Sequence, residues 1–188
     1  MEFDQVIVEK IPEIKEIQSV ALREKVISAW QFAFQDSLWK CAIDEVPFND
    51  KINGITLIKH TRSVTQEAIA MAKHLQETYD VELNRDYVLA IALLHDCCKL
   101  VETKPDENNV SVKSEVGGLY PHGAMSFAYA KKAGLPEEVC HAILTHTAQC
   151  RMTPKTLEGL LVRYVDSLDA DCLYFLSPYP TLMERGNK

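Results

Sequence analysis

The spacing of apolar side chains predicts helices along almost the whole chain, because it repeats every three to four residues and seldom alternates. The first amphipathic stretch runs from Pro12 to about Ile43, as one helix or two abutting ones. A loop rich in Pro, Asn, Asp and Gly follows over residues 45–55. We interpret residues 1–55 as an N-terminal helical arm that packs on a helical domain of residues 56–188, the two forming one structural unit. The fold class expected is all-α.

Two further helices carry polar groups at positions where core residues are expected. The first covers residues 56–79, and His60 lies on its apolar face. Asn84 can cap the next helix, and the apolar stretch "AIALLHDCCKL" places His95 and Asp96 in its last turns. Burying two ionisable groups side by side costs several kcal/mol unless something compensates them.

The second half of the chain begins with a polar segment, residues 101–121, and continues with helices. The polar segment contains only a brief alternation that suits a short hairpin, and segments of this length often act as lids. Three helices are then predicted: from Pro121 to Gly134, from Pro136 through "ILTHT", and from about Thr153 through "LLVRYVDSLDAD".

Composition narrows the class of protein. A chain of 188 residues can bury one substantial core, and its net charge of −7 argues against nucleic acid as the main partner. No apolar run approaches the roughly 18 residues of a transmembrane helix, and the N-terminus does not resemble a secretory signal. We therefore expect a cytoplasmic protein without a membrane partner, whose scattered cysteines are reduced. A small anionic substrate requires a local positive charge, which a metal can supply.

The candidate chemistry is a set of histidines and aspartates at interior-facing positions of the predicted helices. Imidazole and carboxylate together are what divalent first-row metals accept. A cation among these side chains would compensate the buried pair. The set comprises His60, His95, Asp96, His122, His146 and Asp166.

This ordered set resembles the HD superfamily of metal-dependent phosphohydrolases over roughly residues 56–172. The matching contexts are "IKHTRSV", "ALLHDCCKL", "YPHGAMSFA", "ILTHTAQ" and "RYVDSLDA". The resemblance implies an HD-domain helical bundle. It also implies a first metal held by His60, His95, Asp96 and Asp166. Members with two intervening histidines hold a second metal with the aspartate bridging, and here those histidines are His122 and His146. Asp169, one turn beyond Asp166, is an alternative ligand.

The expected cofactor is a pair of divalent transition-metal ions, Fe, Mn, Ni or Co, with Mg and Zn less favoured. Asp96 would be catalytic as the bridging ligand. Lys99, three residues further, is either a solvated lysine or, as in similar family members, a catalytic contact to the substrate phosphate. Weaker candidates for substrate binding are Thr147, Arg62 and Arg151. His74 and His141 should lie away from the site, the latter facing solvent.

The resemblance favours a phosphohydrolase that acts on a nucleotide or another small phosphate ester through metal-activated water. The alternatives are a di-iron oxygenase of the HD type and a metal-stabilised regulatory module without turnover. The expected partner is a small phosphorylated molecule, and the protein would be a monomer or a homodimer.

Overall fold

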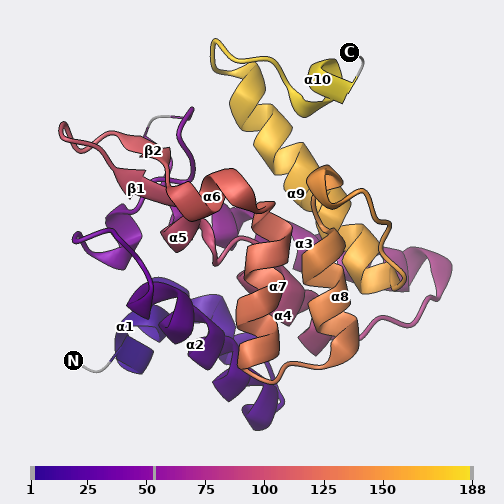
Figure 1. Cartoon of the computed structure of the whole chain (residues 1–188). Helices are drawn as coiled ribbons and strands as arrows, with labels where there is room; N and C mark the ends of the chain where they lie inside the picture. The colour runs from indigo at the N-terminus through magenta and orange to yellow at the C-terminus, as the bar shows by residue number, and fades with distance from the viewer. Residues whose placement is uncertain (1–2, 53, 187–188) are drawn as a thin grey trace.

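The computed structural model describes residues 3–52 and 54–186 of the chain. The first two residues of the expected arm, Asn53 of the expected loop, and the last two residues lie outside the described part. The elements run in the order α1 (Phe3–Lys10), η1 (Pro12–Glu16), α2 (Val20–Gln35), η2 (Ile43–Glu45), α3 (Leu57–Tyr79), α4 (Arg85–Leu94), α5 (Lys99–Glu102), β1 (Thr103–Pro105), β2 (Ser111–Lys113), α6 (Glu115–Leu119), α7 (His122–Lys132), α8 (Glu137–Thr145), η3 (Ala148–Cys150), α9 (Leu157–Phe175) and α10 (Leu182–Gly186). Over the described residues the protein is an all-α bundle apart from the hairpin of β1 and β2 (Figure 1).

Helix α4 lies at the centre of the bundle, with α2, α3, α8 and α9 packed around it. Every residue from Val88 to Leu94 is buried, which explains why this helix reads as a continuous apolar run. The indole Nε1 of Trp30 in α2 donates to the carbonyl of Leu93, 3.1 Å away. Buried isoleucines of α1 and η1, Ile7 and Ile14, belong to the same hydrophobic core as α4.

The N-terminal region differs from the expected helix between Pro12 and Ile43. Pro12 opens only a short 3-10 helix, and the chain is extended at Ile17 and Ser19 before α2 begins. Two tertiary hydrogen bonds hold this break, because the Asp86 carboxylate accepts from the backbone N–H groups of Gln18 and Ser19 at 2.9 and 2.8 Å. Helix α2 then ends at Gln35. The periodicity could not reveal a break that a distant aspartate stabilises.

The expected helix boundaries near the histidines agree with the structure where capping residues mark them. Thr56 and Asn84 accept from backbone N–H groups in the first turns of α3 and α4. Gly134 ends α7 with a φ of +74°, a conformation that favours glycine. Helix α9 starts at Leu157, later than the expected Thr153, because Thr156 caps it.

The segment 101–121 is ordered by secondary structure of its own. Strands β1 and β2 pair antiparallel in the register Thr103↔Lys113, and α6 follows directly. The short hairpin was foreseen, but α6 was not. Among the described residues no helix is long and apolar enough to cross a bilayer.

Candidate metal centre

The pair His95–Asp96 occupies a turn between α4 and α5, not the last turns of a helix as expected. The backbone N–H of His95 still donates to Ile91 at 2.9 Å, so α4 ends at this histidine. Residues 95–98 form the turn that leads into α5. Both side chains are buried at the C-terminal end of α4.

The structure brings all six predicted ligand residues together from five parts of the chain. They form two groups, and within each group one potential ligand atom per residue lies within 4.8 Å of the others. The first group comes from α3, the turn after α4, and α9. The second comes from the same turn and from the facing ends of α7 and α8. The first group is His60, His95 and Asp166. The second group is Asp96, His122 and His146.

The carboxylate of Asp96 lies between the two groups, with a different oxygen toward each. Its Oδ2 is 3.7 Å from Nε2 of His60 and 3.7 Å from Nε2 of His95. Its Oδ1 is 3.7 Å from Nε2 of His122 and 3.7 Å from Nε2 of His146. A carboxylate in this position can bridge two cations.

Hydrogen bonds at the outer ring nitrogens turn the imidazoles toward the centre. Nδ1 of His95 donates to the carbonyl of Ala92 at 2.6 Å, and Nδ1 of His146 donates to that of Ile143 at 2.7 Å. Since a carbonyl can only accept, Nδ1 carries the proton in both rings. In the neutral form of either ring, Nε2 is therefore the nitrogen that can bind a metal.

The two aspartates of α9 have different positions around His60. Oδ1 of Asp166 lies 3.3 Å from the inward Nε2 of His60, whereas Oδ2 of Asp169 lies 2.7 Å from the outward Nδ1. Ser63 donates to the other oxygen of Asp169 at 2.7 Å. Asp166 thus faces the centre, and Asp169 lies behind the ring of His60. This geometry favours Asp166 over Asp169 as a ligand.

Several atoms of the site are buried without a hydrogen-bond partner among the described residues. They are Oδ1 of Asp96, Nδ1 of His122 and Nε2 of His146. Leaving a buried polar atom unpaired is costly, and a cation in the second group would satisfy two of these atoms, Oδ1 of Asp96 and Nε2 of His146. Nitrogen and carboxylate oxygen are ligands of divalent transition metals, and the residues present fit such ions.

The pKa values of the site follow from burial opposed by close charges. Burial acts to raise the pKa of Asp96, but Lys99 and His95 hold it well below its usual range. Burial acts to lower the pKa of His60, yet hydrogen bonds to Asp166 and Asp169 raise it to about 9. Burial and the charge of Lys99 keep the pKa of His122 well below its usual value. The centre therefore has ionised carboxylates and, at His122, a neutral imidazole.

The four predicted substrate contacts are placed very differently. Lys99 is buried, not solvated, and its Nζ lies 2.6 Å from Oε2 of Glu102. Thr147 directly follows His146 and caps η3. Arg62 lies on a neighbouring face of α3, where its Nε donates to both oxygens of Glu13 at 3.0 and 3.1 Å.

Arg62 also lines a groove of about 710 Å³ between α1, the segment before α3, and α3 itself. Arg151 is exposed, just after η3. Lys99 and Thr147 therefore lie next to the six residues in the fold, whereas Arg62 is engaged elsewhere. His74 is exposed on α3, but His141 is half-buried with a shielded Nε2, so the expectation that it faces solvent was wrong.

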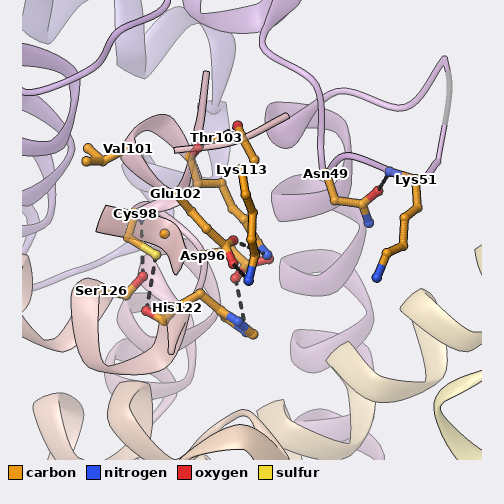
Figure 2. Close-up of polar contacts among 12 residues, drawn as sticks. Asn49, Lys51, Asp96, Cys98, Val101, Glu102, Thr103, Lys113, His122 and Ser126 are labelled. Carbon is orange, nitrogen blue, oxygen red and sulfur yellow. Dashed lines mark hydrogen bonds and ion pairs between the residues drawn. The ribbon is translucent and has the colours of Figure 1, made fainter. Parts of the chain in front are cut away.

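Sequence reasoning missed the wall of the site formed by the loop before α3. The ring of Phe48 packs on His60 with a centroid distance of 4.0 Å, and Nζ of Lys99 lies 5.9 Å from the same ring. Asn49 orders this loop through its side-chain oxygen, which accepts from the backbone N–H of Lys51 at 2.8 Å (Figure 2). An aromatic residue within a polar loop was the available signal.

Comparisons with known proteins agree with this geometry. A family model described as the HD domain matches residues 57–171. A curated relative, the dihydroneopterin 2′,3′-cyclic phosphate phosphodiesterase of Methanocaldococcus jannaschii, is 36% identical over 115 residues. The aligned part is 61% of this chain and 46% of the relative, so the chain spans about half of the relative's length. No solved structure gives a significant match. The family match confirms the expected resemblance to the HD family and its all-α fold.

Proposed function

This chain belongs to the HD domain family, and we propose that it hydrolyses phosphate esters of small molecules at a centre of two divalent metal ions. The position of Asp96 carries the proposal, because each of its oxygens faces the histidines of a different group. A single-metal site would not need the second group, in which Oδ1 of Asp96 and Nε2 of His146 are buried without a hydrogen-bond partner.

In this proposal each of the two donor groups binds one metal ion. The first ion would be held by His60, His95 and Asp166, the second by His122 and His146, with Asp96 shared. When bound, two such ions would supply Lewis acidity to a phosphoryl group and would activate water. The site then needs no serine or cysteine nucleophile. Lys99 would place its ammonium group on a phosphate oxygen as a point charge.

The donor set also suggests which metals fit. Four imidazoles and two carboxylates suit Fe, Mn, Ni or Co, whereas Mg prefers oxygen ligands. Structural Zn sites are usually four-coordinate, and a shared carboxylate between two groups favours higher coordination. We therefore propose two ions of the Fe, Mn, Ni or Co class for each chain.

The substrate class follows from the centre together with the relative. The relative is named as a phosphodiesterase for a cyclic phosphate. We propose a small phosphorylated substrate, and the first to test are nucleoside 2′,3′-cyclic phosphates and nucleotides. A cytoplasmic location, a monomeric or homodimeric state, and a single unit made of residues 1–55 and 56–188 stay predictions.

The test combines metal analysis with a substrate screen. The purified chain, reconstituted with Mn²⁺ or Fe²⁺, should hold close to two ions and hydrolyse at least one phosphate ester in the screen. Asp96→Asn should lose both ions and all turnover. The matched control is Asp171→Asn on α9, whose carboxylate accepts from the backbone of Leu182. A chain that binds no metal after reconstitution would contradict the proposal.

An iron-loaded chain that consumes oxygen and hydrolyses no ester would indicate the oxygenase instead. A metal-bound chain with neither activity would indicate a regulatory module.

A further inference from the structure

The β1–β2 hairpin brings a second lysine to the edge of the metal centre. Lys113 ends β2, and its Nζ lies 3.7 Å from Oε1 of Glu102. The other oxygen of that carboxylate, Oε2, lies 2.6 Å from Nζ of Lys99. One carboxylate thus holds two ammonium groups, one from α5 and one from the hairpin.

The backbone around this carboxylate is fixed by tertiary contacts. Lys113 is directly opposite Thr103 in the sheet, and the backbone N–H of Ser114 donates to the carbonyl of Glu102 at 2.9 Å. Helix α6 packs on the same carbonyl so closely that a Cβ at Gly117 would lie 2.1 Å from its oxygen. The hairpin and α6 therefore hold Lys113 in a defined position beside Glu102.

Two lysines contact Glu102, and Lys99 is also close to the ionised carboxylate of Asp96, which leaves Lys113 as the more exposed cation of the cluster. The side chain of Glu102 is only 5% exposed, and one lysine would suffice to neutralise it. The inner lysine, Lys99, is 10% exposed, but Lys113 is 50% exposed. Figure 2 shows Glu102 and Lys113 pointing toward Asp96 and His122. Lys113 thus presents a partly solvated ammonium group at the edge of the metal centre.

We infer that Lys113 forms a second anion subsite, which binds a phosphate group of the substrate other than the one hydrolysed. Glu102 is the positioning residue that holds Lys113 and Lys99 as a pair. The side chain of Lys99 is the more buried of the two lysines, so Lys99 is the inner cation and Lys113 the outer one. Lys113 approaches Glu102 from the outer side, where a further phosphate group would lie.

This inference rests on the proposed function, because the first phosphate group is the one held at the metal centre. It adds a substrate class, namely small molecules with two phosphate groups, such as a nucleoside diphosphate. A lysine that is already oriented by a carboxylate loses less freedom when it binds an anion.

The first experiment compares the binding of adenosine 5′-monophosphate and adenosine 5′-diphosphate to the Mn²⁺-loaded protein by calorimetry. The parent should bind the diphosphate more tightly. Lys113→Met should reduce this preference about 3- to 10-fold, the size expected of a charge-assisted contact that is partly screened by solvent. Lys104→Met is the matched control. Lys104 pairs with Val112 and therefore lies on the other face of the hairpin, so its replacement should leave the preference unchanged.

A double-mutant cycle tests the positioning role of Glu102. Glu102→Gln keeps the shape of the side chain but removes the charge that orients both lysines. It should lower the preference for the diphosphate as much as Lys113→Met, and the double variant should lower it no further. If the double variant loses the sum of the two single losses in diphosphate preference, Glu102 and Lys113 act independently, and Glu102 does not position Lys113.

Other outcomes separate this subsite from the proposed hydrolysis. Equal affinity of the parent for both nucleotides, or an unchanged preference in Lys113→Met, overturns the subsite. An equal loss of diphosphate preference in Lys104→Met overturns it too, because the result would then depend on the total positive charge of the hairpin and not on the position of Lys113. The binding measurement needs no turnover. A parent that discriminates the nucleotides but hydrolyses no phosphate ester would keep the subsite and refute the proposed function.

Discussion

Replacing Asp169 by Asn should weaken metal binding although this residue does not face the metal centre. Its Oδ2 lies 2.7 Å from Nδ1 of His60, whose Nε2 points toward the first donor group. A carboxylate in this place fixes the ring orientation and makes the opposite nitrogen a stronger ligand. The Asn side chain keeps the size but not the charge. His60 would then be a weaker and less well-oriented ligand.

The expected magnitude follows from this contact and its burial. Loss of such a partner typically lowers metal affinity about 10- to 100-fold, or about 1.4–2.7 kcal/mol. The upper half of this range is expected here, because the His60 side chain is 0% exposed and that of Asp169 is 11% exposed, so solvent screens the contact little.

A second effect works in the opposite direction at neutral pH. Hydrogen bonds to Asp166 and Asp169 raise the pKa of His60 to about 9, although burial opposes them. A metal must displace that proton below pH 9. Asp169→Asn lowers the pKa of His60 and so removes part of this competition. The loss of affinity should therefore be smaller at pH 7 than at pH 8.5.

A competition titration against a chromophoric chelator at both pH values measures this difference. Asp171→Asn on the same helix serves as the control and should bind metal as the parent does. The reasoning about His60 is refuted if Asp169→Asn binds both ions with the affinity of the parent at pH 8.5. A loss that is larger at pH 7 would refute the argument about proton competition.

Three further predictions follow from the same geometry. His122→Ala should keep one ion of the two and lose most turnover, whereas Asp96→Ala should lose both, as elemental analysis would show; two ions and full activity in His122→Ala would exclude a binuclear centre. The metal affinity of the parent should rise with pH until it levels off near pH 9, because below that pH a proton must leave His60; a flat profile between pH 6 and 8.5 in the chelator titration would contradict this. Gly117→Ala should lower the free energy of unfolding by about 1–3 kcal/mol, since its Cβ would lie 2.1 Å from a carbonyl oxygen of α5. Gly118→Ala, with no atom within 4 Å of its Cβ, should not lower it when both are compared by urea denaturation.

The sequence alone determined where most helices of the bundle lie, because their signals are local. Thr56 and Asn84 cap the helices that follow them, and Gly134 takes the left-handed conformation at the end of another. The apolar run of α4 marked the centre of the core. The order of histidines and aspartates likewise indicated the metal-binding family before any geometry was known, since ligand chemistry is a property of residue types.

Local signals failed where a distant residue decides the backbone. Asp86 binds the N–H groups that interrupt the N-terminal arm, so periodicity over residues 12–43 predicted too long a helix. The pair His95–Asp96 lies in a turn, and α6 forms in a segment that reads as a loop. The turn and α6 both depend on packing between elements, and the periodicity of apolar residues does not predict such packing.

Only the tertiary structure decided what each side chain does at the centre. Asp166 and Asp169 lie one turn apart, and the sequence left either as a possible ligand. They meet opposite nitrogens of His60, which lies more than a hundred positions earlier, so only the packing of α9 on α3 distinguishes them. The contact between Lys113 and Glu102 likewise depends on the hairpin register. Ligand types are encoded locally, but directions of side chains at a shared site are fixed by contacts between segments far apart in the chain.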